Sequence, residues 1–325
     1  MRTWSINLLM SLLSAGYCAI ASADSLVLQQ TIELRDVHGR IDHMDFDAAT
    51  KRLYVAALGS GSIEVIDLKA SKRTSRIEGL SEPQGVRYLA SAGRLVVSEG
   101  GANAVNVYAD GRRVITMSDL ADADNVRLDV ASGDVYVGYT SALALIDPMS
   151  LQVRRRIVLS GHPEAFELAS SSPAIYVNVP TAHHIAVIDR ISSKVTATWH
   201  VDDASQNFAM AFDEPHHRLF IATRQPATLQ VYDATNGKRV AALAICGDVD
   251  DLFFDGARLQ LYAVCGEGAV DVVRQEDADH YRAVDRVPTS PGARTGFFVP
   301  TLSTLFVATP SRAGSQAAIR VYHVQ

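Results

Sequence analysis

The feature that most constrains the fold is a short motif that recurs seven times at a nearly constant spacing. Each copy is a four-residue run of β-branched, aromatic and small residues, and the second residue of each copy follows the previous one by 40 to 44 positions. These second residues are Tyr54, Val96, Tyr136, Tyr176, Phe220, Tyr262 and Phe306. A fixed period of this length indicates a repeat architecture, in which each copy is one supersecondary unit.

Each repeat contains four strand-like segments. The recurring run is followed by a second apolar segment, clearest at residues 63–67, 185–189 and 229–233, and preceded by another, as at 44–47 and 210–213. A fourth, more polar segment comes last, as at 194–198, with charged residues that suit an exposed sheet edge. Four strands in about 40 residues form one propeller blade, so the sequence predicts an all-β, seven-bladed β-propeller with four antiparallel strands per blade.

The chain ends predict how the ring closes. The seventh repeat stops at Gln325, just after its third strand at residues 319–322, so its fourth strand is missing. Residues 26–34 supply a spare strand before the first repeat. We expect this segment to complete the last blade and to cover an edge that would otherwise be unpaired. The alternative, an open solenoid, needs capping repeats that the sequence does not show.

The N-terminus predicts export. Residues 8–20 form an apolar run of signal-peptide length after Arg2, and Ala21-Ser22-Ala23 is a cleavage signature. We expect a signal peptide at 1–23, one propeller domain at 24–325, a periplasmic or secreted location, and a monomer with no membrane span after cleavage. The net charge of −6 becomes −7 once Arg2 is removed. A mildly acidic chain is not expected to bind nucleic acid.

The motifs resemble the YVTN-type family of bacterial seven-bladed propellers, which includes the YncE-like periplasmic proteins. The resemblance is carried by the Tyr-Val core of the recurring run, by the Val-Ile-Asp ending of the next strand, and by Pro-containing entries at residues 82–86 and 162–164. It covers the chain after residue 23 and implies the fold, without assigning an activity. The sequence departs from the family's Pro-x-Gly entry at Asp42-His43, Asp124-Asn125, Asn207, Asp250-Asp251 and Arg294.

Candidate functional residues lie just before the first strand of each blade, because that strand is innermost in a propeller. The first-strand positions are Met44, Val86, Val126, Phe166, Met210, Leu252 and Phe297. The preceding loops should open onto one mouth of the central channel, where we expect Asp42, Gln84, Asn125, Asn207 and Arg294 to bind a ligand. The loops between second and third strands, one of which carries Arg224, should form an outer rim.

Two chemistries fit these residue types. Asp124, Glu164, Asn207, Asp250 and Asp251 offer oxygen ligands for a hard cation such as Ca²⁺ or Mg²⁺. His43 and His162 offer general acid and base groups beside Glu164. A structural alternative stays open, since Asp and Asn also stabilise turns and a histidine can simply be a hydrogen-bonded loop residue.

Two functions therefore remain open. The first is an exported propeller that binds a small molecule or an envelope protein at its mouth. The second is a Ca²⁺- or Mg²⁺-dependent hydrolase or lyase of lactonase-like type, acting at the same place. Cys246 and Cys265 remain after export and either pair in a disulfide or stay separate thiols.

Overall fold

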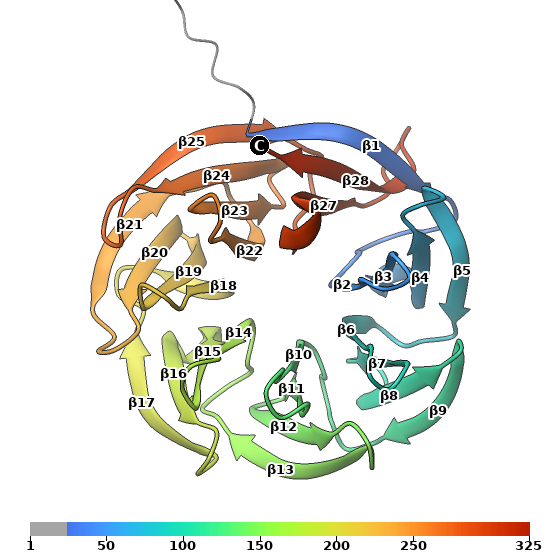
Figure 1. Ribbon diagram of the computed structural model, residues 1–325, viewed down its shortest axis with the longest axis horizontal. Helices are drawn as coiled ribbons and strands as arrows, with labels where there is room; N and C mark the ends of the chain where they lie inside the picture. The colour runs from blue at the N-terminus through green and yellow to red at the C-terminus, as the bar shows by residue number, and fades with distance from the viewer. Residues whose placement is uncertain (1–24) are drawn as a thin grey trace, which may run out of the picture.

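The computed structural model describes residues 25–325, which form seven four-stranded antiparallel sheets arranged around a central axis (Figure 1). The predicted fold class is confirmed. The expected signal peptide at 1–23 lies outside the described residues. Within these, no helix is long and apolar enough to cross a membrane.

The strands follow one another outward from the axis within each blade. Blades 1 to 3 comprise β2 (Met44–Asp47), β3 (Arg52–Ala57), β4 (Ser62–Asp67), β5 (Lys72–Glu78); β6 (Pro83–Leu89), β7 (Arg94–Glu99), β8 (Ala104–Ala109), β9 (Arg112–Met117); and β10 (Val126–Leu128), β11 (Val135–Tyr139), β12 (Ala142–Asp147), β13 (Gln152–Val158). Blades 4 to 6 comprise β14 (Phe166–Leu168), β15 (Ala174–Val179), β16 (His184–Asp189), β17 (Lys194–His200); β18 (Ser205–Asp213), β19 (Arg218–Gln225), β20 (Ala227–Asp233), β21 (Arg239–Ala244); and β22 (Val249–Asp255), β23 (Gln260–Cys265), β24 (Ala269–Gln275), β25 (Tyr281–Pro288). Three short 3₁₀ turns, η1 (Leu58–Ser60), η2 (Pro180–Ala182) and η3 (Pro300–Leu302), follow β3, β15 and β26.

Blade 7 is built from both ends of the described chain. It contains β26 (Gly296–Val299), β27 (Thr304–Thr309) and β28 (Ala317–Val324), and its outer strand is β1 (Leu26–Leu34). The two terminal strands are antiparallel, from Leu26 opposite Val324 to Leu34 opposite Ala317. Figure 1 shows β1, in blue, running outside β28, in red. The closure predicted from the leftover strand is confirmed.

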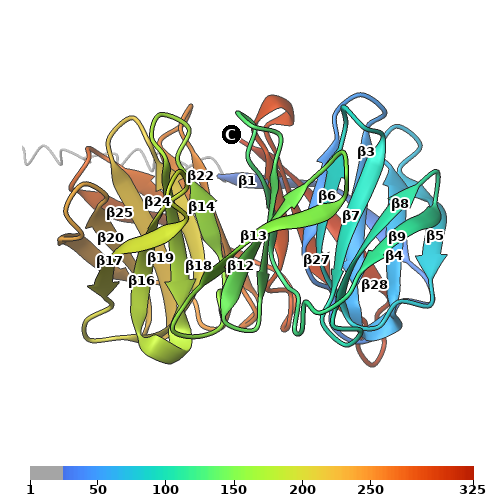
Figure 2. The ribbon, with the colours of Figure 1, turned by 90° about the horizontal axis from the view of Figure 1, so that it is seen from below.

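Apolar packing joins each blade to its neighbour. The recurring runs are the second strands, buried along almost their whole length, as in β11 and β23. Their side chains form seven core clusters among the described residues, each filling the space between two adjacent blades, as Tyr176, Met210 and Tyr232 do between blades 4 and 5. The side view shows the blades standing around the central axis (Figure 2). The rigid ring fixes the loops that precede the inner strands.

Candidate functional site

One residue per blade occupies an equivalent position at the mouth of the channel. In each blade a first-strand residue pairs with the third residue of the recurring run, as Val126 does with Val137. The residues two places earlier are Asp42, Gln84, Asp124, Glu164, Phe208, Asp250 and Arg294. The equivalence is visible in the backbone, since the N–H groups of Asp42, Asp124 and Glu164 donate to Ala56, Gly138 and Asn178 at 2.7, 2.9 and 3.0 Å.

These positions surround a polar cavity of about 310 Å³. All seven blades contribute to its wall, which consists of Arg40, Gln84, Asp122, Asp124, His162, Glu164, Phe208, Arg224, Asp250 and Arg294. A second cavity, of about 140 Å³, lies among the inner strands and shares Asp250. Its wall includes His43 and Asp251, and also Arg87, Arg127 and Glu167. The expected convergence of polar residues at one mouth is therefore present.

Blade 5 places a residue at the mouth that differs from the expected one. Asn207 was expected there, but the residue two places before Met210 is Phe208, and Phe208 lines the cavity. The Asn207 side chain is fully buried and donates to Asn178 Oδ1 at 3.0 Å and to the His184 carbonyl at 3.1 Å. Asn125 is also buried and outside both cavity walls.

In blade 7 the first-strand position is Gly296, which pairs with Val307, and not Phe297 as the sequence suggested. A Cβ at Gly296 would lie 3.0 Å from the Phe306 carbonyl oxygen. Its N–H donates to Asp251 Oδ2 at 2.8 Å, which ties blade 7 to blade 6. One oxygen of Asp251 therefore has a structural role, because it holds β26 of blade 7 against blade 6.

His43 lies among three carboxylates below the outer cavity. Its Nε2 is 3.8 Å from Asp42 Oδ1 and 3.9 Å from Asp124 Oδ1, and its Nδ1 is 3.6 Å from Asp251 Oδ1. Burial alone would lower the pKa of the imidazole, but Asp42, Asp251 and Asp124 outweigh burial and raise it. The site therefore favours a protonated His43, which fits a proton donor better than a base.

Three arginines line the cavity, and sequence reasoning had assigned only Arg294 to it. Arg40 approaches Asp42 at 3.0 Å and Asp250 at 3.6 Å. Arg224, expected at the rim, contacts Asp250, stacks over Phe208 at 3.9 Å and donates to the Val249 carbonyl at 2.8 Å. Arg40 lies in the same entry loop as Asp42, two residues earlier in the chain.

Acidic groups outnumber these arginines. The cavity wall and its ion-pair partners include six acidic side chains, from Asp42, Asp122, Asp124, Glu164, Asp248 and Asp250, against three guanidinium groups and the imidazoles of His43 and His162. Buried oxygens of Asp42, Asp124 and Asp250 accept no hydrogen bond from any described residue. Burying a hydrogen-bond acceptor without a partner is unfavourable, so a ligand that is cationic or donates hydrogen bonds would be favoured at the mouth.

One group of described residues could hold a metal ion, and it consists of Asp124, His162 and Glu164. Each residue offers one ligand atom, and these atoms all lie within 4.8 Å of one another. Burial raises the pKa of Glu164 to about 8, helped by Asp124 and opposed by His162. For Asp124, burial acts in the same direction, but His162, His43 and Arg40 outweigh it and lower the pKa. The expected oxygen-only set, with Asn207, Asp250 and Asp251, is not the group that the structure brings together.

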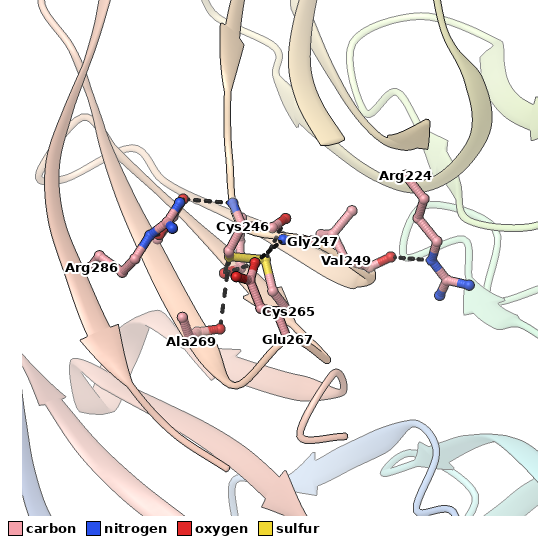
Figure 3. Close-up of a disulfide and its surroundings, with 10 residues drawn as sticks. Arg224, Cys246, Gly247, Val249, Cys265, Glu267, Ala269 and Arg286 are labelled. Carbon is pink, nitrogen blue, oxygen red and sulfur yellow. Dashed lines mark hydrogen bonds and ion pairs between the residues drawn. A yellow bond between two sulfur atoms is a disulfide. The ribbon is translucent and has the colours of Figure 1, made fainter. Parts of the chain in front are cut away.

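A disulfide joins Cys246 to Cys265 beside the mouth (Figure 3). Both cysteines are buried, and the bond ties the loop that enters β22 to the end of β23. The same loop is held by hydrogen bonds from Cys246 N to Asp271 at 2.7 Å and from Gly247 N to Glu267 at 2.7 Å. The loop carries Asp248, which pairs with Arg294, and leads into β22, where Asp250 pairs with Arg224.

We expect Asp42→Asn to stabilise the fold at alkaline pH. Burial raises the pKa of Asp42 to about 7 against the effects of His43 and Arg40, with Asp124 and Asp250 adding like charge. Because the folded-state pKa lies above the unfolded value, the carboxyl's contribution is present below pH 4 and is lost as the pH rises through 7. The variant should be about 1–2 kcal/mol more stable than the wild type at pH 8 and similar at pH 4.

Urea unfolding at the two pH values checks this expectation. Asp277→Asn is the control, because Asp277 is an exposed carboxylate that pairs with His280 away from the mouth. If Asp42→Asn is instead less stable than the wild type at pH 8, then His43 and Arg40 stabilise the ionised carboxylate by more than its burial costs, and the expectation is wrong.

The fold defines the class: the chain is a seven-bladed β-propeller. No family model and no curated protein matches it, but solved structures do. A chain of hydrazine synthase from Kuenenia stuttgartiensis matches with a TM-score of 0.78 and 15% identity, over 94% of this chain and 99% of that one. A chain of a mitotic checkpoint complex matches with a TM-score of 0.77 and 12% identity, over 100% and 99%. At such identities the likeness shows the fold alone.

Proposed function

We propose that this chain is an exported binding propeller whose central mouth holds a small cationic ligand. The observation that carries the proposal is Asp124 Oδ1, a buried carboxylate oxygen without a hydrogen-bond partner among residues 25–325. Buried oxygens of Asp42 and Asp250 also accept no hydrogen bond, although Arg40 approaches them at 3.0 and 3.6 Å. They lie at a mouth where acids outnumber arginines. Deeper in the channel Arg87 pairs with Asp45 and Arg127 lies near Glu167, so positive and negative groups are balanced there and the excess of acids is confined to the mouth.

The size of the cavity supports a small ligand. A volume of about 310 Å³ is at the lower end of the range for small-molecule sites. An envelope protein would fit if it placed one cationic side chain there. The disulfide supports an oxidising compartment, as expected for an exported chain. The recurring Tyr-Val runs support membership of the YVTN-type family, which we propose on the sequence pattern.

Binding of simple ions and amines tests the proposed function. Tag-free mature protein would be titrated with Mg²⁺, Ca²⁺, Zn²⁺, putrescine and spermidine, and with citrate and phosphate as anionic probes. We expect at least one cation to raise the melting temperature, the anions to have no effect, and Asp250→Asn to bind that cation more weakly. Asp277→Asn should bind as the wild type does. Binding of anions only, or equal cation binding by Asp250→Asn, would contradict the proposal.

A hydrolase is the second candidate, favoured by the position of His43 among three carboxylates at 3.6–3.9 Å. Water would add to the acyl carbon of an ester or lactone, and the acyl C–O bond would break to give an acid and an alcohol. His43, favoured in its protonated form, would donate the proton to the leaving oxygen, and the proton that the added water loses would return to His43. A bound divalent cation would supply polarisation of the carbonyl.

A screen of lactones and carboxylic esters tests this candidate. Loss of general acid catalysis in His43→Gln should lower the rate by about 10²- to 10⁴-fold. Glutamine keeps a polar group of similar size among the acids, and a thermal melt of the variant would verify its fold. No turnover by the wild type, or equal turnover by His43→Gln, leaves binding as the function of the mouth.

A further inference from the structure

We propose that Asp124, His162 and Glu164 form a site for a divalent transition metal, best fitted to Zn²⁺. This inference rests on the proposed cationic ligand and names it. The three residues come from the entry loops of adjacent blades 3 and 4 and face one cavity. Asp124 Oδ2 lies 3.8 Å from His162 Nε2. Ligands bonded at about 2.0–2.1 Å in a tetrahedral site are roughly 3.4 Å apart, so small side-chain rotations would complete the geometry.

The Nδ1 atom of His162, which is not the proposed ligand atom, contacts the kinds of acceptor that metal-binding histidines use. His162 Nδ1 lies 3.1 Å from the Thr140 carbonyl oxygen and 3.3 Å from Asp122 Oδ2. A carbonyl oxygen only accepts, so Nδ1 carries the hydrogen and donates it. In the neutral ring, Nε2 then presents its lone pair toward Asp124. A carbonyl or carboxylate on the far nitrogen orients the ring and raises its basicity as a ligand.

An independent observation points to a cation at the same place. Asp124 is nine-tenths buried, and its Oδ1 accepts no hydrogen bond in the part of the chain that the structure describes. His43 Nε2 lies 3.9 Å from this oxygen, which is beyond hydrogen-bonding distance. A metal ion would satisfy this carboxylate where the protein's own donors do not reach it.

The donor set selects the kind of metal. Ca²⁺ and Mg²⁺ are bound by oxygen ligands, whereas an imidazole nitrogen with two carboxylates suits Zn²⁺ and its first-row neighbours. The site therefore favours a borderline cation such as Zn²⁺ over the hard cations, Ca²⁺ and Mg²⁺, that we expected from the sequence. Three protein ligands leave a coordination position toward the cavity, as in metal sites that take an exogenous ligand.

Calorimetric titration of chelator-treated, tag-free protein with ZnCl₂ tests the site. We expect one Zn²⁺ per chain, with tighter binding than of Mg²⁺ or Ca²⁺. Loss of an outer partner of a metal ligand already weakens binding about 10- to 100-fold, so His162→Ala and Asp124→Asn should each weaken it by at least ~100-fold. His216→Ala is the matched control, since His216 Nδ1 pairs with Asp213 at 2.8 Å outside the mouth. It should bind Zn²⁺ like the wild type.

A spectroscopic readout separates ligation from a structural effect. Co²⁺ in place of Zn²⁺ should give visible absorption bands, and these should change in His162→Ala and in Glu164→Gln but not in His216→Ala. Thermal melts of the variants would verify that they are folded. Wild-type protein without stoichiometric Zn²⁺, or with Zn²⁺ binding unchanged by His162→Ala, would overturn the assignment. Binding of an amine but not Zn²⁺ would overturn the metal site alone, and binding of no cation would overturn the proposed function as well.

Discussion

A chain that begins at residue 36, and so lacks β1, is expected not to fold as a monomer. Strand β1 buries Leu26, Ile32 and Leu34, which are at most 3% exposed, and covers the edge of β28. Each of these side chains contributes about 1.5–3 kcal/mol by burial, and the sum is comparable to the roughly 5–15 kcal/mol by which a typical domain is stable. The exposed edge of β28 would also pair with other chains. Circular dichroism and size-exclusion chromatography would measure the outcome.

Point substitutions in β1 provide graded controls. Ile32→Ala should cost about 2–5 kcal/mol, because it leaves a cavity in the core between blades 7 and 1. Leu28→Ala in the same strand should change stability by no more than ~0.5 kcal/mol, because Leu28 is 48% exposed. A truncated chain that is monomeric and cooperatively folded would show that the ring closes without β1.

Removal of the disulfide by the double substitution Cys246→Ala and Cys265→Ala is expected to cost about 3 kcal/mol, since the bond closes a loop with a sequence separation of 19. Urea unfolding with and without a reductant would measure this cost. The reductant should destabilise the wild type and leave the double variant unchanged. Equal stability of the two oxidised proteins would contradict the expectation.

The same double variant should bind a cation at the mouth more weakly. The disulfide holds the loop that leads into β22, and a looser loop would no longer fix the Asp250 carboxylate in the cavity wall. Wild-type affinity in the oxidised double variant would show that Asp271 and Glu267 hold the loop unaided.

The fold could be predicted because it depends on a local pattern repeated seven times. The recurring runs became the buried second strands, and the unmatched segment at 26–34 became β1. The sequence also placed Asp42, Gln84, Asp124, Glu164 and Asp250 at equivalent positions, each two residues before the first-strand residue of its blade.

Two positions at the mouth were misassigned by one residue. In blade 5 the residue two places before Met210 is Phe208, whereas the polar Asn207 is buried and donates to Asn178 and His184. In blade 7 the first-strand position is Gly296 and not Phe297, and a Cβ at Gly296 would lie 3.0 Å from the Phe306 carbonyl oxygen. The orientation of His162 depends on the Thr140 carbonyl, 22 residues away. Contacts between blades therefore decide which of the polar residues meet.

The most direct test of a cation at the mouth is an anomalous difference map from a crystal grown with ZnCl₂ and recorded at the zinc edge. We expect one strong peak within about 2.0–2.2 Å of Asp124, His162 and Glu164 side-chain atoms. A map without a peak in the mouth, or with peaks only at exposed histidines such as His216, would contradict the account.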